Sequence, residues 1–526
     1  MPRVQGWRRV AAVMAAAIML ATLVGGCAGA PEPSVNVMVV ATDQEPIISW
    51  DPGCAYSNEV VVLSNVYETL TRYDAKRQEV VPLLATGWTK NADATEWTFT
   101  LRRNVKFHSG DPLDAGAVKF SLDRTIQLGE GASYIWSPVK EIQVVGPYTV
   151  KILTKFPAPV DLLCSAAYAA HIVNPRTAKH DWYEAGNADG TGPYRLESWT
   201  RGVEVVLAKN PDYWGGWGKS QVDQVTFKLV PEASARRRMV ENGQADWVAN
   251  LPYEDIAVLR NNPKLAVVNT PSQLSLFVYL NTRKSPLDNK LVRQAISYAV
   301  PYRAIIETVY AGYAAQSRGI IPDGLWAYSD SVKQYATDLG KAGQLLTQAG
   351  YGPSSGKTLS LSLVYTAGDE AERRAAELLK SGLQGIGVEL ETRGVPWDSG
   401  WAGAKSPDPA ERQDMFMMYW WPDMPMPSGI RALFYTEKEP LFNLSYYANP
   451  AYDTLADEAE RLAGIDRKQA KAKYAEAQNI VVDDAAAVFL CDIANLRVVN
   501  ARLRGYADNP FYPNVVFFYD LVVGVR

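Results

Sequence analysis

The feature that most constrains the fold is the alternation of strand-like and helix-like segments along almost the whole sequence. Trp97–Leu101 alternates apolar and polar residues, as a strand with one wet face does, whereas Arg467–Asp483 carries apolar residues at helical spacing. Short connections join most of these segments. Such alternation is typical of a mixed α/β fold, in which helices cover a sheet.

The same patterns predict the individual elements. At 526 residues the chain is too long for one ordinary domain, so we expect two or three lobes. Strands are expected at 35–42, 97–101, 203–208, 222–230, 274–280, 359–365, 388–392, 487–490 and 515–523. Helices are expected at 59–70, 117–126, 233–242, 289–300, 341–349, 370–382, 450–463 and 467–483.

The N-terminus has the pattern of an export signal. Three arginines precede the 14-residue apolar run 11–24, and small residues precede Cys27. This run is too short for an ordinary membrane span. We interpret 1–26 as a lipoprotein signal peptide, Cys27 as the lipidated first mature residue and 27–34 as a tether. The protein would then be exported and held by lipid on the outer face of the bacterial cytoplasmic membrane, or be periplasmic. An uncleaved anchor and a secretory signal with a chance cysteine are the alternatives.

Composition and cysteine content narrow the function further. The formal net charge of −4 gives no electrostatic footprint for nucleic acid. Fifteen tryptophans and 28 tyrosines can fill cores, and they can also line ligand clefts. Beyond Cys27, only Cys54, Cys164 and Cys491 remain, so at most one intramolecular disulfide is possible and the sequence does not select the pair.

The usual zinc-binding motifs do not occur in the sequence. The three histidines form no His-x-x-x-His pair, and there is no Cys-x-x-Cys. Gly215–Ser220 resembles the end of a phosphate loop, but Tyr213 occupies the position of a required glycine. We therefore expect no catalytic residue, no metal and no cofactor, and a protein that is not an enzyme.

Several short phrases follow one another in a fixed order across about 480 residues, a span that covers nearly the whole mature chain. They are Asn65-Val-Tyr-Glu-Thr-Leu70, Trp97-Thr-Phe-Thr-Leu-Arg102, Val105-Lys-Phe-His108, Gly190-Thr-Gly-Pro-Tyr194, Asn210-Pro-Asp-Tyr-Trp214, Gly243-Gln-Ala-Asp246 and Val292-Arg-Gln-Ala-Ile-Ser-Tyr-Ala299. With them the chain resembles the extracytoplasmic solute-binding proteins of peptide, nickel and opine ABC importers, known as family 5.

The resemblance implies an α/β, two-lobed fold of the periplasmic-binding-protein type (type II, cluster C), with an extra subdomain in the first lobe. Carried onto this sequence, it places lobe I at 35–60, 188–272 and 492–526, the extra subdomain at 61–187 and lobe II at 273–491. The segment 274–280 would cross between the lobes and 494–499 would return. Hinge closure around a solute is the expected motion, and a monomer is the expected state.

The function that the resemblance implies is that of a substrate-binding lipoprotein of an ABC importer. It would capture a peptide-like solute in the cleft between the lobes and deliver it to the membrane permease, with energy from a separate ATPase. An oligosaccharide is the alternative solute. A secreted hydrolase that uses Asp423 with a distant acid, and a degenerate envelope regulator, are the alternatives of other classes.

The segment Met415–Gly429 matches the family's strand followed by a Trp-x-x-Asp-x-Pro phrase. In peptide-binding members, the acid at the place of Asp423 pairs with the α-amino group of the ligand. Trp420 and Trp421 stand just before it, and strand periodicity allows only one of them to face inward. A loop cap for Asp423 and core packing for the tryptophans are the alternatives.

Further candidate ligand-binding residues come from the same half of the chain. Trp397 matches a cleft tryptophan of the family, Trp401 follows at helical spacing, and Tyr365 ends a predicted strand. The chain also departs from the family. The arginine that clamps the carboxylate of a dipeptide is missing after Tyr365, where the next arginine is Arg373, and Met426 replaces a second acid. Longer peptides, whose termini need no clamp, remain possible.

Overall fold

The computed structural model describes residues 36–55, 58–74, 76–352, 356–408, 411–422, 424–438, 441–507 and 515–524. The predicted leader with Cys27, and Asp423, lie outside the described residues. Within the described ranges, no helix has the length and apolar character needed to cross a membrane. Cys54, Cys164 and Cys491 are free thiols.

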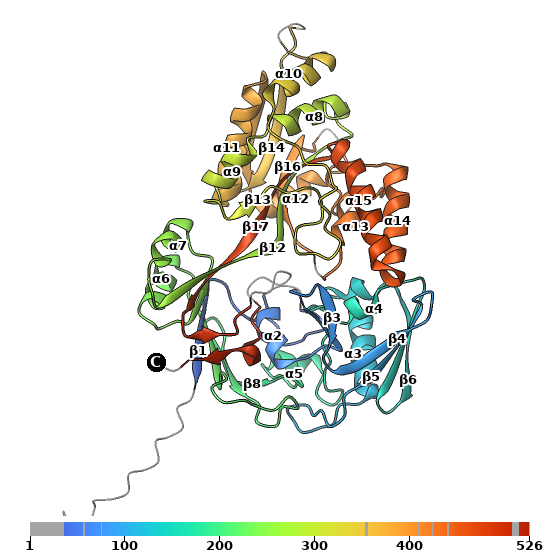
Figure 1. The fold of residues 1–526 in the computed structure, drawn as a ribbon, viewed down its shortest axis with the longest axis vertical. Helices are drawn as coiled ribbons and strands as arrows, with labels where there is room; N and C mark the ends of the chain where they lie inside the picture. The colour runs from blue at the N-terminus through green and yellow to red at the C-terminus, as the bar shows by residue number, and fades with distance from the viewer. Residues whose placement is uncertain are drawn as a thin grey trace, which may run out of the picture. The chain divides into compact units, whose positions relative to one another are not determined.

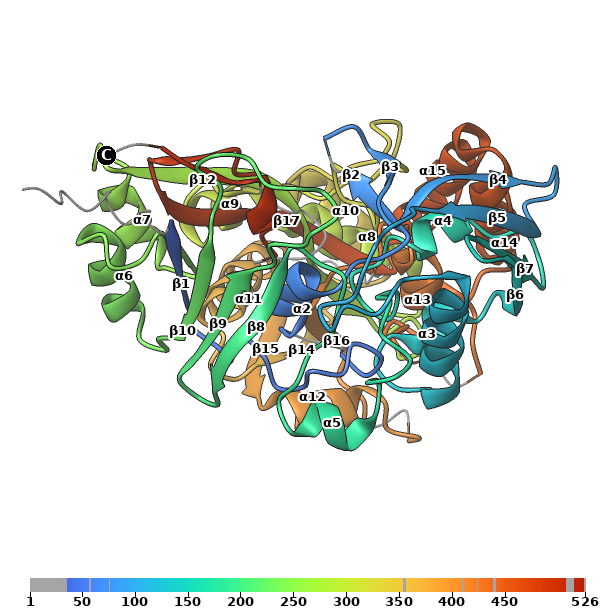
Figure 2. The same ribbon diagram turned by 90° about the horizontal axis from the view of Figure 1, so that it is seen from below.

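A sheet of eleven strands runs through both halves of the fold. Its order is β15-β14-β16-β12-β17-β11-β1-β10-β9-β8, and the short β13 pairs with β17. In that order the strands span Val388–Val395, Leu359–Thr366, Met415–Trp420, Leu265–Leu280, Ala487–Asn500, Trp247–Ala249, Val37–Thr42, Gln224–Leu229, Glu204–Lys209 and Tyr194–Thr200, and β13 spans Ala314–Ala315. Figure 2 shows β1, β10, β9 and β8 side by side at one end of this sheet.

Two long antiparallel strands, β12 and β17, join the halves of the sheet (Figure 1). The C-terminal part of β12, 275–280, pairs with β16. Near its own C-terminus, over 497–499, β17 also pairs with β11. The predicted strands 274–280 and 487–490 are therefore parts of strands that are 16 and 14 residues long, and 494–499 belongs to β17 as well.

A separate antiparallel sheet of four strands lies within the segment predicted to be an extra subdomain. Its order is β4-β5-β7-β6, with bounds Ala85–Lys90, Glu96–Leu101, Thr149–Thr154 and Val139–Gly146. A hairpin of β2 (Thr71–Asp74) and β3 (Glu79–Pro82) precedes it. The division of the chain into lobes at the expected boundaries stays a prediction.

The helices include all those that the periodicity predicts, one of them shortened, and several that it did not predict. They are α2 (Val60–Val66), α3 (Ala115–Leu128), α4 (Val160–Leu163), α5 (His180–Glu184), α6 (Ala233–Glu241), α7 (Tyr253–Leu259), α8 (Lys290–Ala299), α9 (Tyr302–Thr308), α10 (Leu339–Gln348), α11 (Glu370–Gln384), α12 (Trp397–Ala404), α13 (Gly429–Phe434), α14 (Pro450–Ile465) and α15 (Arg467–Asp483). Several begin at a side chain that accepts a hydrogen bond from the first turn, namely Asp114, Asn289, Asp338, Asp369, Asn449 and Asp466.

Two predicted elements are wrong in part. The helix expected at 59–70 ends at Val66, and Tyr67 is already extended. The strand expected at 515–523 is reduced to β19 (Val522–Val523), preceded by a turn of 3-10 helix at Phe518–Asp520. In the second case the side chain of Asn65 supplies the reason. It donates to the carbonyl of Val516 at 2.8 Å and accepts from the amide of Phe518 at 3.1 Å, so it takes the place of a neighbouring strand.

Two glycines allow the chain to come very close to the end of α2. A Cβ atom added to Gly190 would lie 1.9 Å from the carbonyl oxygen of Val66, and one added to Gly192 would lie 2.6 Å from that of Asn65. The amide of Gly192 donates to the Val66 carbonyl at 2.9 Å, which a displaced chain could not do. No residue with a side chain fits here unless the backbone moves.

We therefore expect Gly190→Ala to lower the free energy of unfolding by about 2 kcal/mol or more, because overpacking forces the backbone of this region apart. Urea unfolding followed by tryptophan fluorescence measures the change. Gly343→Ala is the matched control, because this helical glycine has no atom within 4 Å of an added Cβ. The control should be neutral or gain up to about 1 kcal/mol. Equal stability of Gly190→Ala and the wild type would contradict the close approach.

Candidate functional site

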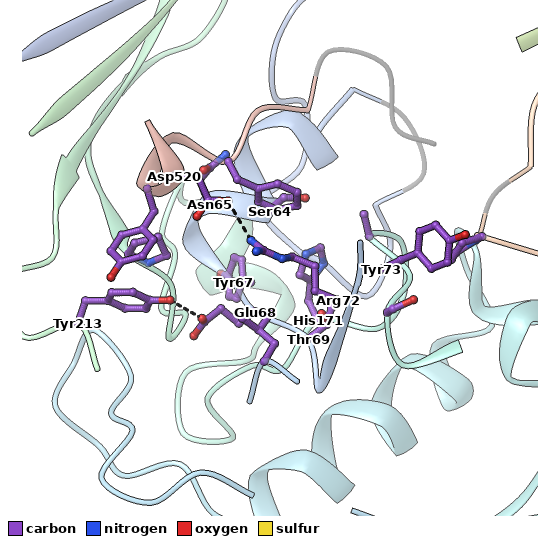
Figure 3. Close-up of a pocket in the computed structure, with 17 residues that line it drawn as sticks. Ser64, Asn65, Tyr67, Glu68, Thr69, Arg72, Tyr73, His171, Tyr213 and Asp520 are labelled. Atoms are coloured by element: carbon purple, nitrogen blue, oxygen red, sulfur yellow. Dashed lines mark hydrogen bonds and ion pairs between the residues drawn. The ribbon is translucent and has the colours of Figure 1, made fainter. Parts of the chain in front are cut away.

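A narrow cavity opens beside the end of α2 (Figure 3). Its described lining combines polar and aromatic side chains, among them Asn65, Tyr67, Glu68, Arg72, His171, Tyr213, Phe517, Tyr519 and Asp520. Pro425, from the loop that follows β16, also lines it. The cavity has a volume of about 70 Å³, which suits a few water molecules rather than a whole solute. A larger ligand would therefore need surfaces beyond this cavity.

Glu68 forms the anionic part of the cavity wall. Its carboxylate accepts hydrogen bonds from the hydroxyls of Tyr213 and Thr191, both at 2.8 Å, and from the indole of Trp214 at 2.9 Å. The side chain is 4% exposed, and this burial raises its pKa from 4.5 to about 7, although the three donors act in the opposite direction. Glu68 therefore exchanges a proton near neutral pH.

Two other titratable groups of the cavity wall, His171 and Arg72, differ in their charge and in their ion pairing. Burial lowers the pKa of His171 to about 4, so its ring is neutral at physiological pH. Arg72 is the cation of the described lining, and its guanidinium pairs with the Asp520 carboxylate at 3.2 Å. Both partners of this pair are partly exposed, so solvent screens it and a ligand carboxylate could compete for Arg72.

The structure brings three of the predicted ligand-binding tryptophans into one aromatic cluster. Trp397 and Trp401, one turn apart on α12, stack with their ring centroids 5.5 Å apart. Phe442 links them to the end of β16, because its ring lies 5.7 Å from Trp401 and 5.4 Å from Trp420. Trp397 is 42% exposed, so this cluster presents an open aromatic face.

The other predicted residues lie in different surroundings. Trp421, just beyond β16, is 47% exposed, whereas Trp420 is half-buried. The ring of Tyr365 packs over Gly394 of the neighbouring strand, where an added Cβ would meet it at 3.1 Å. Of the predicted residues that the structure describes, none lines the cavity beside Glu68.

The polar residues of the cavity, Glu68 and Arg72 among them, were not predicted from the sequence as site residues. Glu68 is the one acid between Val60 and Thr71, in a run that the structure buries throughout. A lone acid within an apolar run is the signal that could have identified it, since a buried charge needs partners. Arg72 follows four residues later and gave no comparable signal.

Comparisons with known proteins agree with this architecture. The family model for bacterial extracellular solute-binding proteins, family 5 (middle region), matches residues 79–441. The probable D,D-dipeptide-binding periplasmic protein DdpA of Escherichia coli K12 is 31% identical over 503 residues, which cover 91% of this chain and 93% of that protein. The glutathione-binding protein GsiB of Salmonella choleraesuis is 28% identical over 498 residues, with 89% and 95% of the two chains covered.

A solved structure confirms the fold class. The periplasmic binding protein DppA of Helicobacter pylori, in complex with the peptide STSA, superposes with a TM-score of 0.74. The identity is 24%, and the alignment covers 93% of this chain and 98% of that one. The expected two-lobed α/β fold of the type II periplasmic binding proteins is therefore confirmed.

Glu68→Gln should change how stability depends on pH. Between pH 4.5 and about 7 the folded protein keeps the proton of Glu68 while the unfolded chain has lost it, so this group lowers the free energy of unfolding as pH rises through that window. Glutamine cannot titrate. We expect the wild type to lose stability relative to the variant between about pH 5 and about pH 8.

Urea unfolding of both proteins at the two pH values measures this difference. Comparing wild type with variant removes the contributions of Glu372 and Asp492, whose pKa values are raised to about 7 and about 6. A stability difference that is the same at both pH values would show that Glu68 does not titrate in this window.

Proposed function

The chain belongs to family 5 of the bacterial extracellular solute-binding proteins, and on this premise we propose that it captures a peptide-like solute for an ABC importer. The match to the family over 79–441 carries the proposal. The names of relatives add the solute class, since DdpA is named for a D,D-dipeptide, GsiB for glutathione, and the Helicobacter protein holds a peptide. Such a protein binds without turnover and is no enzyme; permease and ATPase subunits in trans would complete the importer.

The proposed solute site combines two surfaces. On lobe II, the aromatic cluster of Trp397, Trp401 and Trp420 would contact apolar parts of the solute, with Trp421 next to Trp420 in the chain and Tyr365 on the adjacent strand β14. On lobe I, the cavity beside Glu68 supplies polar groups. Asp423, which lies outside the described residues, would pair with an amino group. The lobes would close by bending at β12 and β17, with lobe boundaries as expected from the family.

The side chains around β14 support a solute whose carboxylate is not clamped there. Arg373 is the first arginine after β14, and its guanidinium is bound to Glu370 at 2.5 Å and to Glu377 at 2.6 Å on the exposed side of α11. Both partners are exposed carboxylates of the same helix, so Arg373 is not part of a buried clamp for a ligand carboxylate. Peptides longer than two residues fit this arrangement.

We expect a pool of peptides of about two to five residues to raise the melting temperature of the purified protein, since a ligand that binds only the folded state stabilises it. Trp397→Ala should weaken binding of the best peptide about tenfold, because a partly exposed aromatic wall is lost. Isothermal titration calorimetry measures that change. Tyr134→Ala is the matched control, since Tyr134 is 47% exposed, close to the 42% of Trp397, but lies on the first-lobe side.

Other outcomes would replace this proposal by one of its alternatives. Stabilisation by neutral oligosaccharides alone would favour a sugar-binding protein that uses the same tryptophans for stacking. Hydrolysis of chromogenic glycosides or peptides would favour a secreted hydrolase. If neither peptides nor sugars bind, the family membership stands, and a regulator with a degenerate cleft becomes the better explanation.

Lipid anchoring at Cys27 is a separate part of the proposal. Cys27→Ala should move the protein from the membrane fraction to the soluble fraction of the cell, because the lipid would be the only membrane attachment. Immunoblotting of the two fractions measures this, with Cys54→Ala as a control that keeps Cys27. Equal membrane retention of Cys27→Ala would contradict a lipid anchor at this cysteine.

A further inference from the structure

Asp492 lies on the long strand β17 in the same row of the sheet as the aromatic cluster. It is directly opposite Ser275 of β12, and Ser275 is directly opposite Trp420 of β16. Residues that pair in this way across antiparallel strands point to the same face. At about 4.8 Å per strand, the Cα of Asp492 stands about 10 Å from that of Trp420, within the reach of one small solute.

The carboxylate of Asp492 is fixed at one oxygen. Its Oδ1 accepts hydrogen bonds from the hydroxyl of Ser275 at 2.7 Å and from that of Ser317 at 2.5 Å. In the described parts of the chain, no side chain binds Oδ2, and no lysine, arginine or histidine forms an ion pair with this acid. Asp492 is partly exposed, so the second oxygen is open to an approaching group.

The neighbours of Asp492 add further acceptors instead of a compensating cation. Burial, helped by the negative charge of Asp323, raises the pKa of Asp492 to about 6. The amide of Gln273 donates through Nε2 to the Asp323 carbonyl at 3.3 Å. Its Oε1 is buried and has no hydrogen-bond partner among the described residues, although the residue is only 1% exposed. The uncompensated acid and the unsatisfied buried amide oxygen are each costly unless a donor arrives.

The expected first lobe approaches this part of the second lobe next to Asp323. The carbonyl of Gly324, next to Asp323, accepts a hydrogen bond at 3.2 Å from the side chain of Gln78, in the β2–β3 hairpin. Asp492 therefore stands near the junction of the two sides, and not in the interior of one of them.

We propose that Asp492, positioned by Ser275 and Ser317 and accompanied by Gln273, forms a subsite for a positively charged group of the solute, an ammonium or a guanidinium. A cation that donates hydrogen bonds to Oδ2 would compensate the charge of this acid. A metal ion is a poorer occupant, because no group of three or more His, Cys, Asp and Glu side chains that could hold one exists in the described ranges. This inference rests on the proposed function and narrows its solute to cationic peptides.

Matched peptides test the subsite. One pool of two- to five-residue peptides contains lysine, a second has norleucine in its place, and each is prepared with a free and with an acetylated N-terminus. Affinities come from titration calorimetry on the full chain. We expect lysine peptides to bind the wild type about tenfold or more tightly than norleucine peptides with the same N-terminus. The free and acetylated pools separate this preference from pairing of the α-amino group with Asp423.

Variants then assign that preference to Asp492. Asp492→Asn keeps an acceptor for the two serines, and it should bind lysine and norleucine peptides with the same N-terminus within about threefold of each other. Asp330→Asn is the matched control, because it removes the same charge from an 86% exposed side chain, and it should keep the wild-type preference. If Asp492→Asn does not fold, Ser317→Ala replaces it, and the preference should then shrink in part.

The outcomes separate this inference from the proposed function. Wild-type protein that binds lysine and norleucine peptides equally would overturn the cationic subsite and leave peptide binding intact. The subsite would also be overturned if Asp492→Asn kept the full preference. If no pool binds the wild type, the proposed peptide function itself is wrong, and the subsite falls with it.

Discussion

The position of the cavity wall depends on one buried carboxyl group. Glu68 joins three segments that are far apart in sequence, because its partners Thr191 and Trp214 lie 123 and 146 residues away. Burying an acid is unfavourable unless donors replace the lost water, and here three side chains do so. The close approach of Gly190 to Val66 follows from the same junction. Any solute that enters the cavity meets a surface whose backbone is fixed by this network.

The second constraint is the ribbon of β12 and β17, which carries the sheet from one side to the other. Its ladder is interrupted between Thr270 and Leu274, and this interruption separates the part that faces β11 from the part that pairs with β16. A bend located there would break fewer ladder hydrogen bonds than a bend elsewhere. Away from the ribbon, Arg467 of α15 pairs with the buried Asp161 of α4 at 2.7 Å, so side chains also connect the expected lobe II with the expected subdomain.

The sequence predicts what is decided locally. The helices that follow Asp114, Asp369 and Asp466 were expected from helical periodicity, and in the structure each of these aspartates caps the first turn. The strand predicted at 515–523 failed because the side chain of Asn65, 451 residues from Val516, takes the backbone bonds that a neighbouring strand would have supplied. The periodicity of a segment cannot reveal a hydrogen-bond partner that is so distant in the sequence.

The same distinction applies to the site. Trp397 and Trp401 could be predicted to meet because four residues separate them on a helix. The roles of Glu68, Arg72 and Asp492 could not be predicted, because each role depends on partners that only tertiary folding brings close. Asp492 makes the point most clearly: its sequence neighbours are apolar or small, and the serine that completes its anchoring is 175 residues away. The aromatic surface can contact many solutes, but a charged group with one open oxygen discriminates between them. The residues that decide selectivity are therefore those that a local pattern cannot reveal.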